Sequence, residues 1–240
     1  MPATYKVLSA LLSYPERSFQ EGAHELIAAL EREALLPAVH RGALGRLISQ
    51  MAQADLLDIQ AEYVDLFDRS RALSLHLFEH IHGESRDRGQ AMVSLRERYR
   101  EAGLEIRANE LPDYLPLFLE FLSLQEPGEA RLMLSETQHI LAALARRLEQ
   151  RESSYAAVLD ALIALAGVRP DSSTAPELPE TGVDNPNDFA ALDRAWEEAE
   201  VRFGPGDATG SGCPRAAELL GKMSPPSSRA DAKLSDGVEP

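Results

Sequence analysis

Apolar residues recur every three or four positions through the first 166 residues, the spacing that places them on one face of an α-helix. The first such run carries Val7, Leu8, Leu11 and Leu12, and Pro15 ends it. The same pattern predicts helices at 3–14, 19–33, 39–52, 55–67, 71–81, 85–102, 112–124, 128–148 and 155–165. No stretch of this region alternates apolar and polar residues as a half-buried strand does, so an all-α fold is predicted.

Capping and turn residues set several of the predicted boundaries. Asp55 can cap the helix that follows it, because a short acidic side chain accepts a bond from a free backbone N–H. Gly103 and Gly167 each suit the position just after a helix, where positive φ is common. Pro112 suits a first helical turn. Pro116, one turn later, indicates that this helix starts late or has an irregular first turn.

The character of the chain changes after residue 167. Residues 169–187 hold four of the fifteen prolines and few large apolar side chains, so they cannot bury enough surface to offset their ordering entropy. We therefore expect a single-domain helical bundle at 1–167, a linker at 168–187, an amphipathic helix at 188–203 and a flexible, disordered tail at 204–240. The amphipathic helix packs on the body or on a partner, and its exchange between two copies would give a homodimer.

Acidic residues outnumber basic ones by 39 to 24, which gives a net charge of -15. This charge disfavours nucleic acid as a ligand and suits a basic polypeptide, although acidity also serves solubility alone. The single cysteine, Cys213, excludes an internal disulfide and a multi-cysteine metal cluster. We find no run of the roughly 20 apolar residues that span a bilayer and no signal-peptide pattern, so we expect a cytoplasmic protein without membrane insertion.

One short motif is typical of metal chemistry. His76 and His80 lie four positions apart in a predicted helix with Glu79 beside them, as in zinc hydrolases of the H-x-x-E-H type. Zinc requires a third protein ligand, and the candidates Glu149 and Glu152 sit among arginines on what reads as a solvated face. A zinc hydrolase is therefore the alternative interpretation, and histidines that only brace a helix are a simpler one.

Acidic and aromatic residues alternate around the same motif. No phosphate-binding, dinucleotide-binding or nucleophile-elbow motif is present, so the sequence offers no complete active site. Carboxylates beside aromatic rings would suit a groove for a positively charged amphipathic helix, formed by the helices around 55–68, 71–82 and 112–124. The interleaved residues are Glu62, Tyr63, Asp65, Phe67, Asp68, Phe78, Glu79, Glu84 and Asp87.

Three segments resemble one known family. They read EYVDLFDR at 62–69, LSLHLFEHIHGESRDRGQAM at 73–92 and ELPDYLPLFLEFL at 110–122. Together they resemble the NarJ-type assembly chaperones of respiratory nitrate reductase, within the redox-enzyme maturation chaperones that include TorD and DmsD. The likeness extends from Tyr5 to about Ala166, and the segment at 73–92 is highly specific. Tyr114 departs from the histidine that commonly follows the Pro-Asp pair in this family.

The resemblance implies a helical bundle of the TorD-like chaperone type without catalytic activity. Such chaperones bind the N-terminal segment of the nitrate reductase catalytic (alpha) subunit and keep the apoenzyme competent for molybdenum cofactor insertion before membrane docking. No stably bound cofactor is expected, and molybdenum cofactor biosynthesis proteins are further candidate partners. Carried over to this sequence, the resemblance implies a peptide-binding surface made of Glu62, Tyr63, Phe67, His76, Phe78, Glu79, His80, Asp113 and Tyr114.

Overall fold

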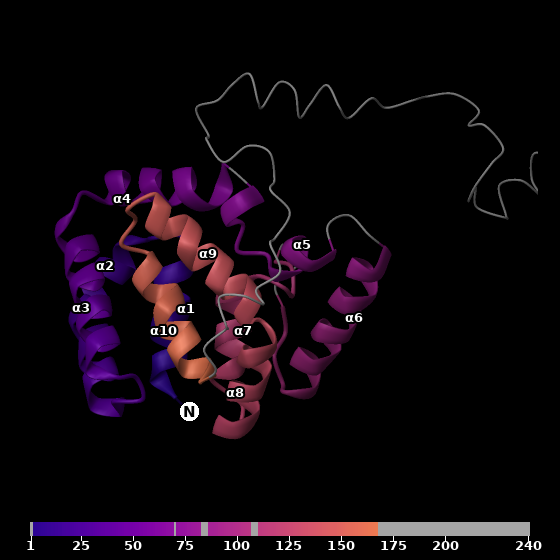
Figure 1. The fold of residues 1–240 in the computed structure, drawn as a ribbon. Coiled ribbons are helices and arrows are strands. Elements are labelled where there is room, and N and C mark those ends of the chain that lie inside the picture. Colours follow the sequence, from indigo (N-terminus) through magenta and orange to yellow (C-terminus); the bar gives the residue numbers. More distant parts are fainter. Residues whose placement is uncertain (1, 70, 83–85, 107–109, 168–240) are drawn as a thin grey trace, which may run out of the picture. The chain divides into compact units, whose positions relative to one another are not determined.

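The helical spacing of apolar residues produces helices throughout the part of the chain that the structure describes, residues 2–69, 71–82, 86–106 and 110–167 of a computed structural model (Figure 1). The α-helices there are α1 (Ala3–Leu12), α2 (Arg17–Glu33), α3 (Ala38–Gln53), α4 (Leu56–Tyr63), α5 (Leu77–His82), α6 (Arg86–Glu101), α7 (Leu115–Leu122), α8 (Pro127–Glu136), α9 (Gln138–Gln150) and α10 (Ala156–Ala166). These ranges contain no strand, which confirms the all-α prediction. The predicted linker, amphipathic helix and tail lie outside the described residues.

Helix α1 lies at the centre of the bundle, packed against α2, α7 and α10 (Figure 1, indigo). Its Leu8, Leu11 and Leu12 are all 0% exposed. Burying each such side chain stabilises the fold by about 1.5–3 kcal/mol relative to leaving it in water. The apolar stripe of the first helix therefore organises the core that positions α7 and the segment before it.

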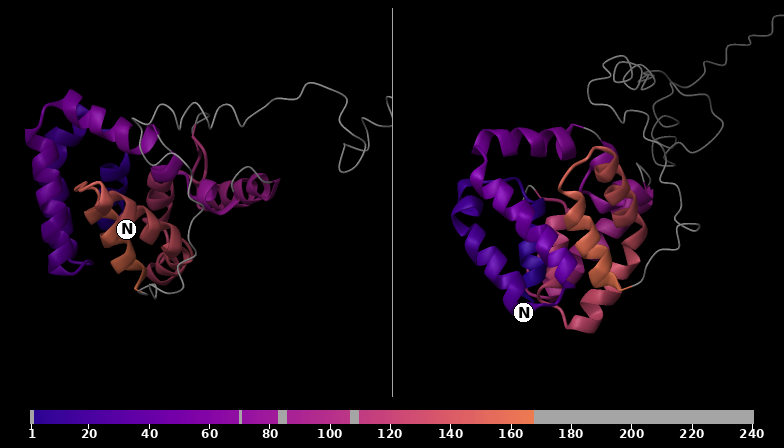
Figure 2. Two further views of the ribbon diagram at one scale, coloured as in Figure 1. Left: turned by 45° about the horizontal axis from the view of Figure 1, so that its top comes forward. Right: turned by 60° about the vertical axis from the view of Figure 1, so that its left-hand side comes forward.

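Helices α5 and α6 lie at the edge of this bundle and pack against each other (Figure 2). The C-terminal turn of α6 is fixed to the bundle by Tyr99, which is 0% exposed. Its ring lies 4.7 Å from that of Phe121, and its hydroxyl donates to the carbonyl of Pro112 at 2.8 Å. One aromatic residue therefore joins α6 both to α7 and to the segment that precedes α7.

Several predicted boundaries are confirmed. The side chain of Asp55 accepts a bond from the N–H of Leu57 at 2.8 Å and caps α4. Gly103 and Gly167 adopt φ of 78° and 74°, the left-handed conformation expected after a helix. Helix α7 starts late, at Leu115, so the first turn contains Pro116 rather than Pro112.

Two predicted helices are wrong in extent. The long helix predicted at 128–148 is two helices that meet at Thr137 (φ -92°, ψ 0°), whose hydroxyl donates to the carbonyl of Leu134 at 2.9 Å. The helix predicted at 71–81 is also wrong. Only Leu77–His82 is α-helical, preceded by a 3-10 turn at Arg71–Leu73 and a short non-helical segment in which His76 forms an antiparallel bridge with Tyr114.

Candidate functional site

Two segments far apart in the sequence, 74–78 and 111–115, lie side by side at the start of α5 and α7. The N–H of Leu115 donates to the carbonyl of Leu75 at 2.8 Å, and the N–H of Leu77 donates to the carbonyl of Asp113 at 3.0 Å. These bonds surround an isolated antiparallel bridge between His76 and Tyr114. The bridge explains why residues 74–76 are not helical, since the carbonyl of Leu75 pairs with Leu115 instead of closing a helical turn.

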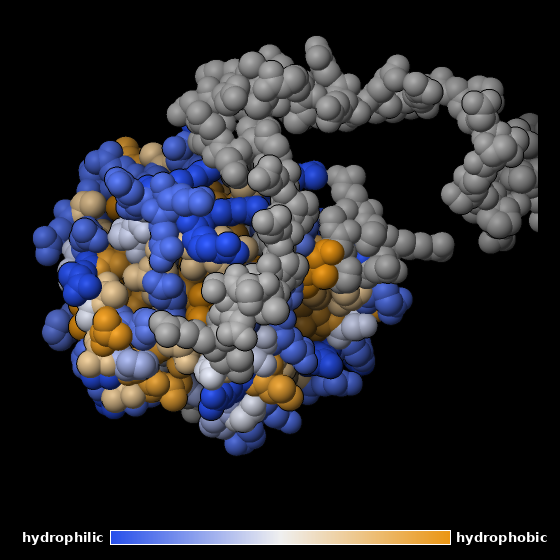
Figure 3. Space-filling model, in the orientation of Figure 1, coloured by the Kyte–Doolittle hydropathy of each residue, from blue (hydrophilic) through white to orange (hydrophobic). Residues whose placement is uncertain are grey.

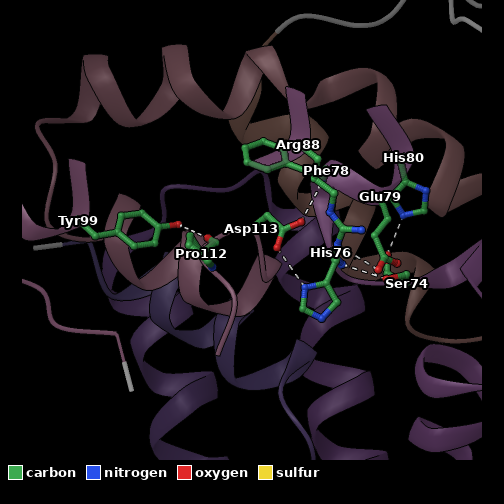
Figure 4. Close-up of polar contacts among 9 residues, drawn as sticks. All are labelled: Ser74, His76, Phe78, Glu79, His80, Arg88, Tyr99, Pro112 and Asp113. Carbon is green, nitrogen blue, oxygen red and sulfur yellow. Dashed lines mark hydrogen bonds and ion pairs between the residues drawn. The ribbon is translucent and has the colours of Figure 1, made fainter. Parts of the chain in front are cut away.

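The carboxylate of Asp113 is the centre of this junction (Figure 4). It is 0% exposed, so it requires hydrogen-bond donors to offset the loss of water. One oxygen accepts from the N–H of Phe78 at 3.1 Å, and the other lies 3.2 Å from Nδ1 of His76, which donates because a carboxylate only accepts. Asp113 therefore orders the first turn of α5 and sets the orientation of the His76 ring.

His80 has a different partner from His76. Its Nε2–H donates to the carbonyl of Ser74 at 2.8 Å, the bond drawn at the right of Figure 4. Burial lowers the pKa of His80 from its ordinary 6.5, and the charge of nearby Arg147 lowers it further, while the Ser74 bond acts in the opposite direction. The neutral ring thus braces the segment that leads into α5.

The zinc site that the sequence allowed requires His76 and His80 to lie in the same helix, and only His80 lies in α5. His76 precedes α5, and its ring points to Asp113 while that of His80 points to Ser74. In the described ranges, no group of three or more His, Cys, Asp and Glu side chains could hold a metal ion. Glu79 instead pairs with Arg88 at 3.2 Å.

Tyr63 supports the junction from the side of α4. Its hydroxyl donates to the carbonyl of Leu12 at 2.9 Å and lies 3.0 Å from the hydroxyl of Tyr114. Its ring packs on Phe67 at 5.0 Å, and Phe67 packs on Tyr155 at 5.2 Å. Burial, followed by the neighbouring Tyr114, raises the pKa of Tyr63, so its hydroxyl keeps its proton.

Tyr114 and His76 form the accessible part of the site. Their rings are 5.4 Å apart, Tyr114 is half-buried, and the His76 side chain is 31% exposed. Burial raises the pKa of Tyr114, the hydrogen bond with Tyr63 lowers it, and the charges of the exposed Asp68 and Glu110 raise it again. We call Asp68, His76, Glu110 and Tyr114, together with the exposed Tyr14 that contacts Tyr63 edge-on, the acidic aromatic surface.

The structure divides the predicted peptide-binding residues into two groups. Tyr63, Phe67 and Asp113 are 3%, 6% and 0% exposed, so they position their neighbours and present almost no surface to a ligand. His76, Phe78, Glu79, His80 and Tyr114 are partly exposed, and Glu62 is exposed on α4, where its charge raises the pKa of buried Tyr155 after the larger effect of burial. A direct contact of any of them with a peptide stays a prediction.

Two residues of the acidic aromatic surface were missed by sequence reasoning. Tyr14 comes from the end of the first predicted helix, and no local pattern there indicates a contact with Tyr63. Glu110 is the first residue of a segment that carries the family resemblance, and this position could have identified it as a candidate site residue.

Comparison with known proteins decides the family. The model of the family "Nitrate reductase delta subunit" matches residues 16–161. The chain belongs to this family. The "Nitrate reductase molybdenum cofactor assembly chaperone NarJ" of Escherichia coli K12 is 45% identical over 199 residues, covering 82% of this chain and 83% of that protein. The "Probable nitrate reductase molybdenum cofactor assembly chaperone NarW" of the same strain is 42% identical and covers 85% of both chains.

A solved structure supports the fold of this delta subunit family member. A putative redox enzyme maturation protein from Archaeoglobus fulgidus aligns with a TM-score of 0.51 and 23% identity, covering 70% of this chain and 94% of that one. At that identity the similarity concerns the fold alone. Within the described part of the chain, no helix combines the length and the apolar character needed to cross a bilayer.

Proposed function

We propose that this protein, a system-specific maturation chaperone for nitrate reductase, binds the N-terminal segment of the catalytic subunit on its acidic aromatic surface. The bound apoenzyme would remain competent for molybdenum cofactor insertion and would dock on the membrane only afterwards. The observation that carries the proposal is the partly exposed pair of rings, His76 and Tyr114, which lie 5.4 Å apart, and the charges of the exposed Asp68 and Glu110 raise the pKa of Tyr114. The family, whose named relatives are molybdenum cofactor assembly chaperones, supports the same client.

The chemistry of this surface suits a basic amphipathic helix. The faces of Tyr14 and Tyr114 offer apolar contact and attract a cation positioned over the ring. The carboxylates of Asp68 and Glu110 give the cationic side of the ligand a fixed orientation and increase its association rate. A net charge of -15 adds long-range attraction for the same ligand.

Buried bonds hold the surface in a defined shape before any ligand binds. The carboxylate of Asp113 orients the His76 ring through a hydrogen bond, and the Tyr63 hydroxyl forms a hydrogen bond with the Tyr114 hydroxyl. A ligand that meets an ordered surface loses less of its binding free energy to ordering side chains. The buried residues of the predicted site therefore contribute to recognition indirectly.

The chaperone's own part in this proposal is binding rather than catalysis. The cofactor is cargo for the client, and the proposal requires no metal or cofactor held by this chain. A cytoplasmic location follows from the client, because the apoenzyme must be loaded before it reaches the membrane.

Calorimetry with a synthetic peptide of the catalytic subunit's N-terminal segment tests the proposal. The double variant Asp68→Asn/Glu110→Gln is compared with Glu21→Gln/Glu25→Gln on α2, which removes the same net charge from exposed acids elsewhere. We expect the first pair to weaken binding about tenfold, or about 1.4 kcal/mol, and the second to change it by less than about twofold. No binding to the wild type at tens of micromolar protein would overturn the proposal.

A further inference from the structure

A groove with apolar lining lies beside α6 and shares Glu110 with the acidic aromatic surface. It has a volume of about 290 Å³. Apolar surface, coloured orange, lies at the edge of the bundle where Figure 1 places α5 and α6 (Figure 3). The lining residues are Met92, Val93, Arg96, Ile106, Glu110, Leu111 and Pro112.

Two apolar side chains of this groove are open to solvent. Val93 is 63% exposed and Leu111 is 46% exposed, and Ile81 on the adjoining α5 is 47% exposed. Helix α6 contacts the bundle through buried Tyr99 and partly buried Leu95, whereas Val93 in the same helix stays exposed. Contiguous exposed apolar groups on a protein surface commonly mark a binding site.

The charged residues Arg96 and Glu110 in the lining of the groove indicate which kind of ligand could bind there. Arg96 is exposed on its wall and makes no ion pair with any residue that the structure describes. Glu110 also lines the groove, so a ligand with a single sign of charge along its whole length would not fit it. An occupant with an apolar stripe and a carboxylate near Arg96 would satisfy this side chain, whereas a cation in the same position would be repelled.

The chain itself contains such a segment at 188–203. Its Phe189, Leu192 and Trp196 follow the i, i+3, i+7 spacing of one helix face, and five acidic against two basic residues give it a net charge of -3. A helix of this length is marginal in water on its own and needs a surface to pack against. We propose that residues 188–203 dock as a helix in the α6 groove of the same molecule.

The connecting chain is long enough for this contact. Residues 168–187 provide 20 residues between the end of α10 and the segment. A chain of that length spans roughly 25 Å as a flexible coil and about 65 Å when extended. A domain of the size described has a radius of gyration of about 15 Å, so every point on its surface is within reach.

Docking would cover Val93 and Leu111 in the free chaperone. It would also bring carboxylates to the border of the acidic aromatic surface, next to Glu110, and so strengthen the attraction of that surface for a cationic client. The docking itself requires no client, and it stands or fails independently of the proposed function.

The fluorescence of Trp196 tests the proposal, because this residue is the chain's single tryptophan. The full-length protein carrying Val93→Glu is compared with Leu132→Glu, a matched control because Leu132 is 64% exposed on α8. We expect wild type and the control to show blue-shifted emission protected from acrylamide. Val93→Glu should shift emission and quenching to the values of the urea-unfolded chain, while the far-ultraviolet circular dichroism loses no more than the signal of one helix the length of residues 188–203.

The variant Leu192→Glu tests the same contact from the side of the segment and leaves the groove unchanged. It should also expose Trp196. The proposal is overturned if wild-type Trp196 is already as accessible as in urea, or if Val93→Glu and Leu192→Glu leave it protected. Protection that disappears on dilution would also overturn it, since it would indicate a second copy as the occupant.

Discussion

Asp113 fixes His76 across 37 residues of sequence, with 3.2 Å between a carboxylate oxygen and Nδ1. The other oxygen of the same buried carboxylate accepts the N–H of Phe78 at 3.1 Å. One side chain from the segment before α7 thus determines both the first turn of α5 and the position of the ring that borders the accessible site.

Replacing Asp113 should therefore destabilise the whole fold. Asp113→Ala leaves the buried N–H of Phe78 and the His76 ring without their acceptor. We expect a loss of about 2–4 kcal/mol in the free energy of unfolding, measured by urea denaturation. The control Asp65→Ala removes a half-exposed partner of Arg69 and should cost less than about 1 kcal/mol. Equal effects of the two substitutions would contradict the role assigned to Asp113.

Tyr63→Phe isolates one hydroxyl at the base of the site. The change removes the bond to the Leu12 carbonyl and the contact with the Tyr114 hydroxyl while keeping the ring stack. We expect a loss of about 1–2 kcal/mol in thermal or urea unfolding, because a buried carbonyl loses its donor. Tyr14→Phe, at a ring that is 48% exposed, should change stability by less than about 0.5 kcal/mol. A stability of Tyr63→Phe equal to wild type would refute this assignment.

His80 should make stability depend on pH. Burial lowers its pKa in the folded state below the ordinary 6.5, with Arg147 acting in the same direction and Glu79 and Asp113 opposing it. The unfolded chain therefore binds a proton at a higher pH than the folded chain does. Stability from this group is complete above about pH 6.5 and falls as pH drops toward the lowered pKa.

Urea denaturation of wild type and His80→Asn between pH 7.5 and pH 5 measures this effect. The amide of asparagine does not titrate, so the variant should lose less stability than wild type over the acidic part of the range. Parallel curves for the two proteins would show that His80 contributes no pH dependence.

Binding of the client peptide should weaken with salt. Carboxylates at Asp68 and Glu110 act on an exposed surface, and the screening length falls from about 10 Å at 0.1 M salt to about 3 Å at 1 M. Kinetic measurements should show a slower association rate at high salt with a smaller change in dissociation. Asp68→Asn/Glu110→Gln should flatten this dependence, and an unchanged salt response in that variant would place the client elsewhere.

Local signals in the sequence were sufficient for most of the fold. The leucines of α1 reveal its buried face, because helical spacing alone determines which side chains share a face. Asp55, Gly103 and Gly167 mark true helix ends for the same reason, since capping and positive φ are local properties.

The region around His76 could not be predicted in this way. Its apolar spacing is compatible with a helix from residue 71, but a carboxylate from residue 113 and a backbone pairing with Tyr114 compete for the same groups. Such long-range contacts produce no periodic pattern of residues in the sequence. The helical spacing of His76 and His80 therefore suggested a metal motif that the folded chain does not form.

The sequence predicted which segments form the site, but not the role of each residue in it. The resembling segments contain Asp113, Tyr114 and His76, which the structure brings into contact. Burial divides them into supporting and accessible residues, and it depends on the packing of α1, α4 and α7 together. Tyr14 joins them only through its contact with Tyr63, which is 49 positions away in the sequence.

Co-purification from cells that express nitrate reductase tests the central claim most directly. Tagged wild-type protein should retain the nitrate reductase catalytic subunit, identified by mass spectrometry, and Asp68→Asn/Glu110→Gln should retain much less. The Glu21→Gln/Glu25→Gln control should retain as much as wild type. Absence of the catalytic subunit from the wild-type preparation, or equal recovery with all three proteins, would contradict client binding through the acidic aromatic surface.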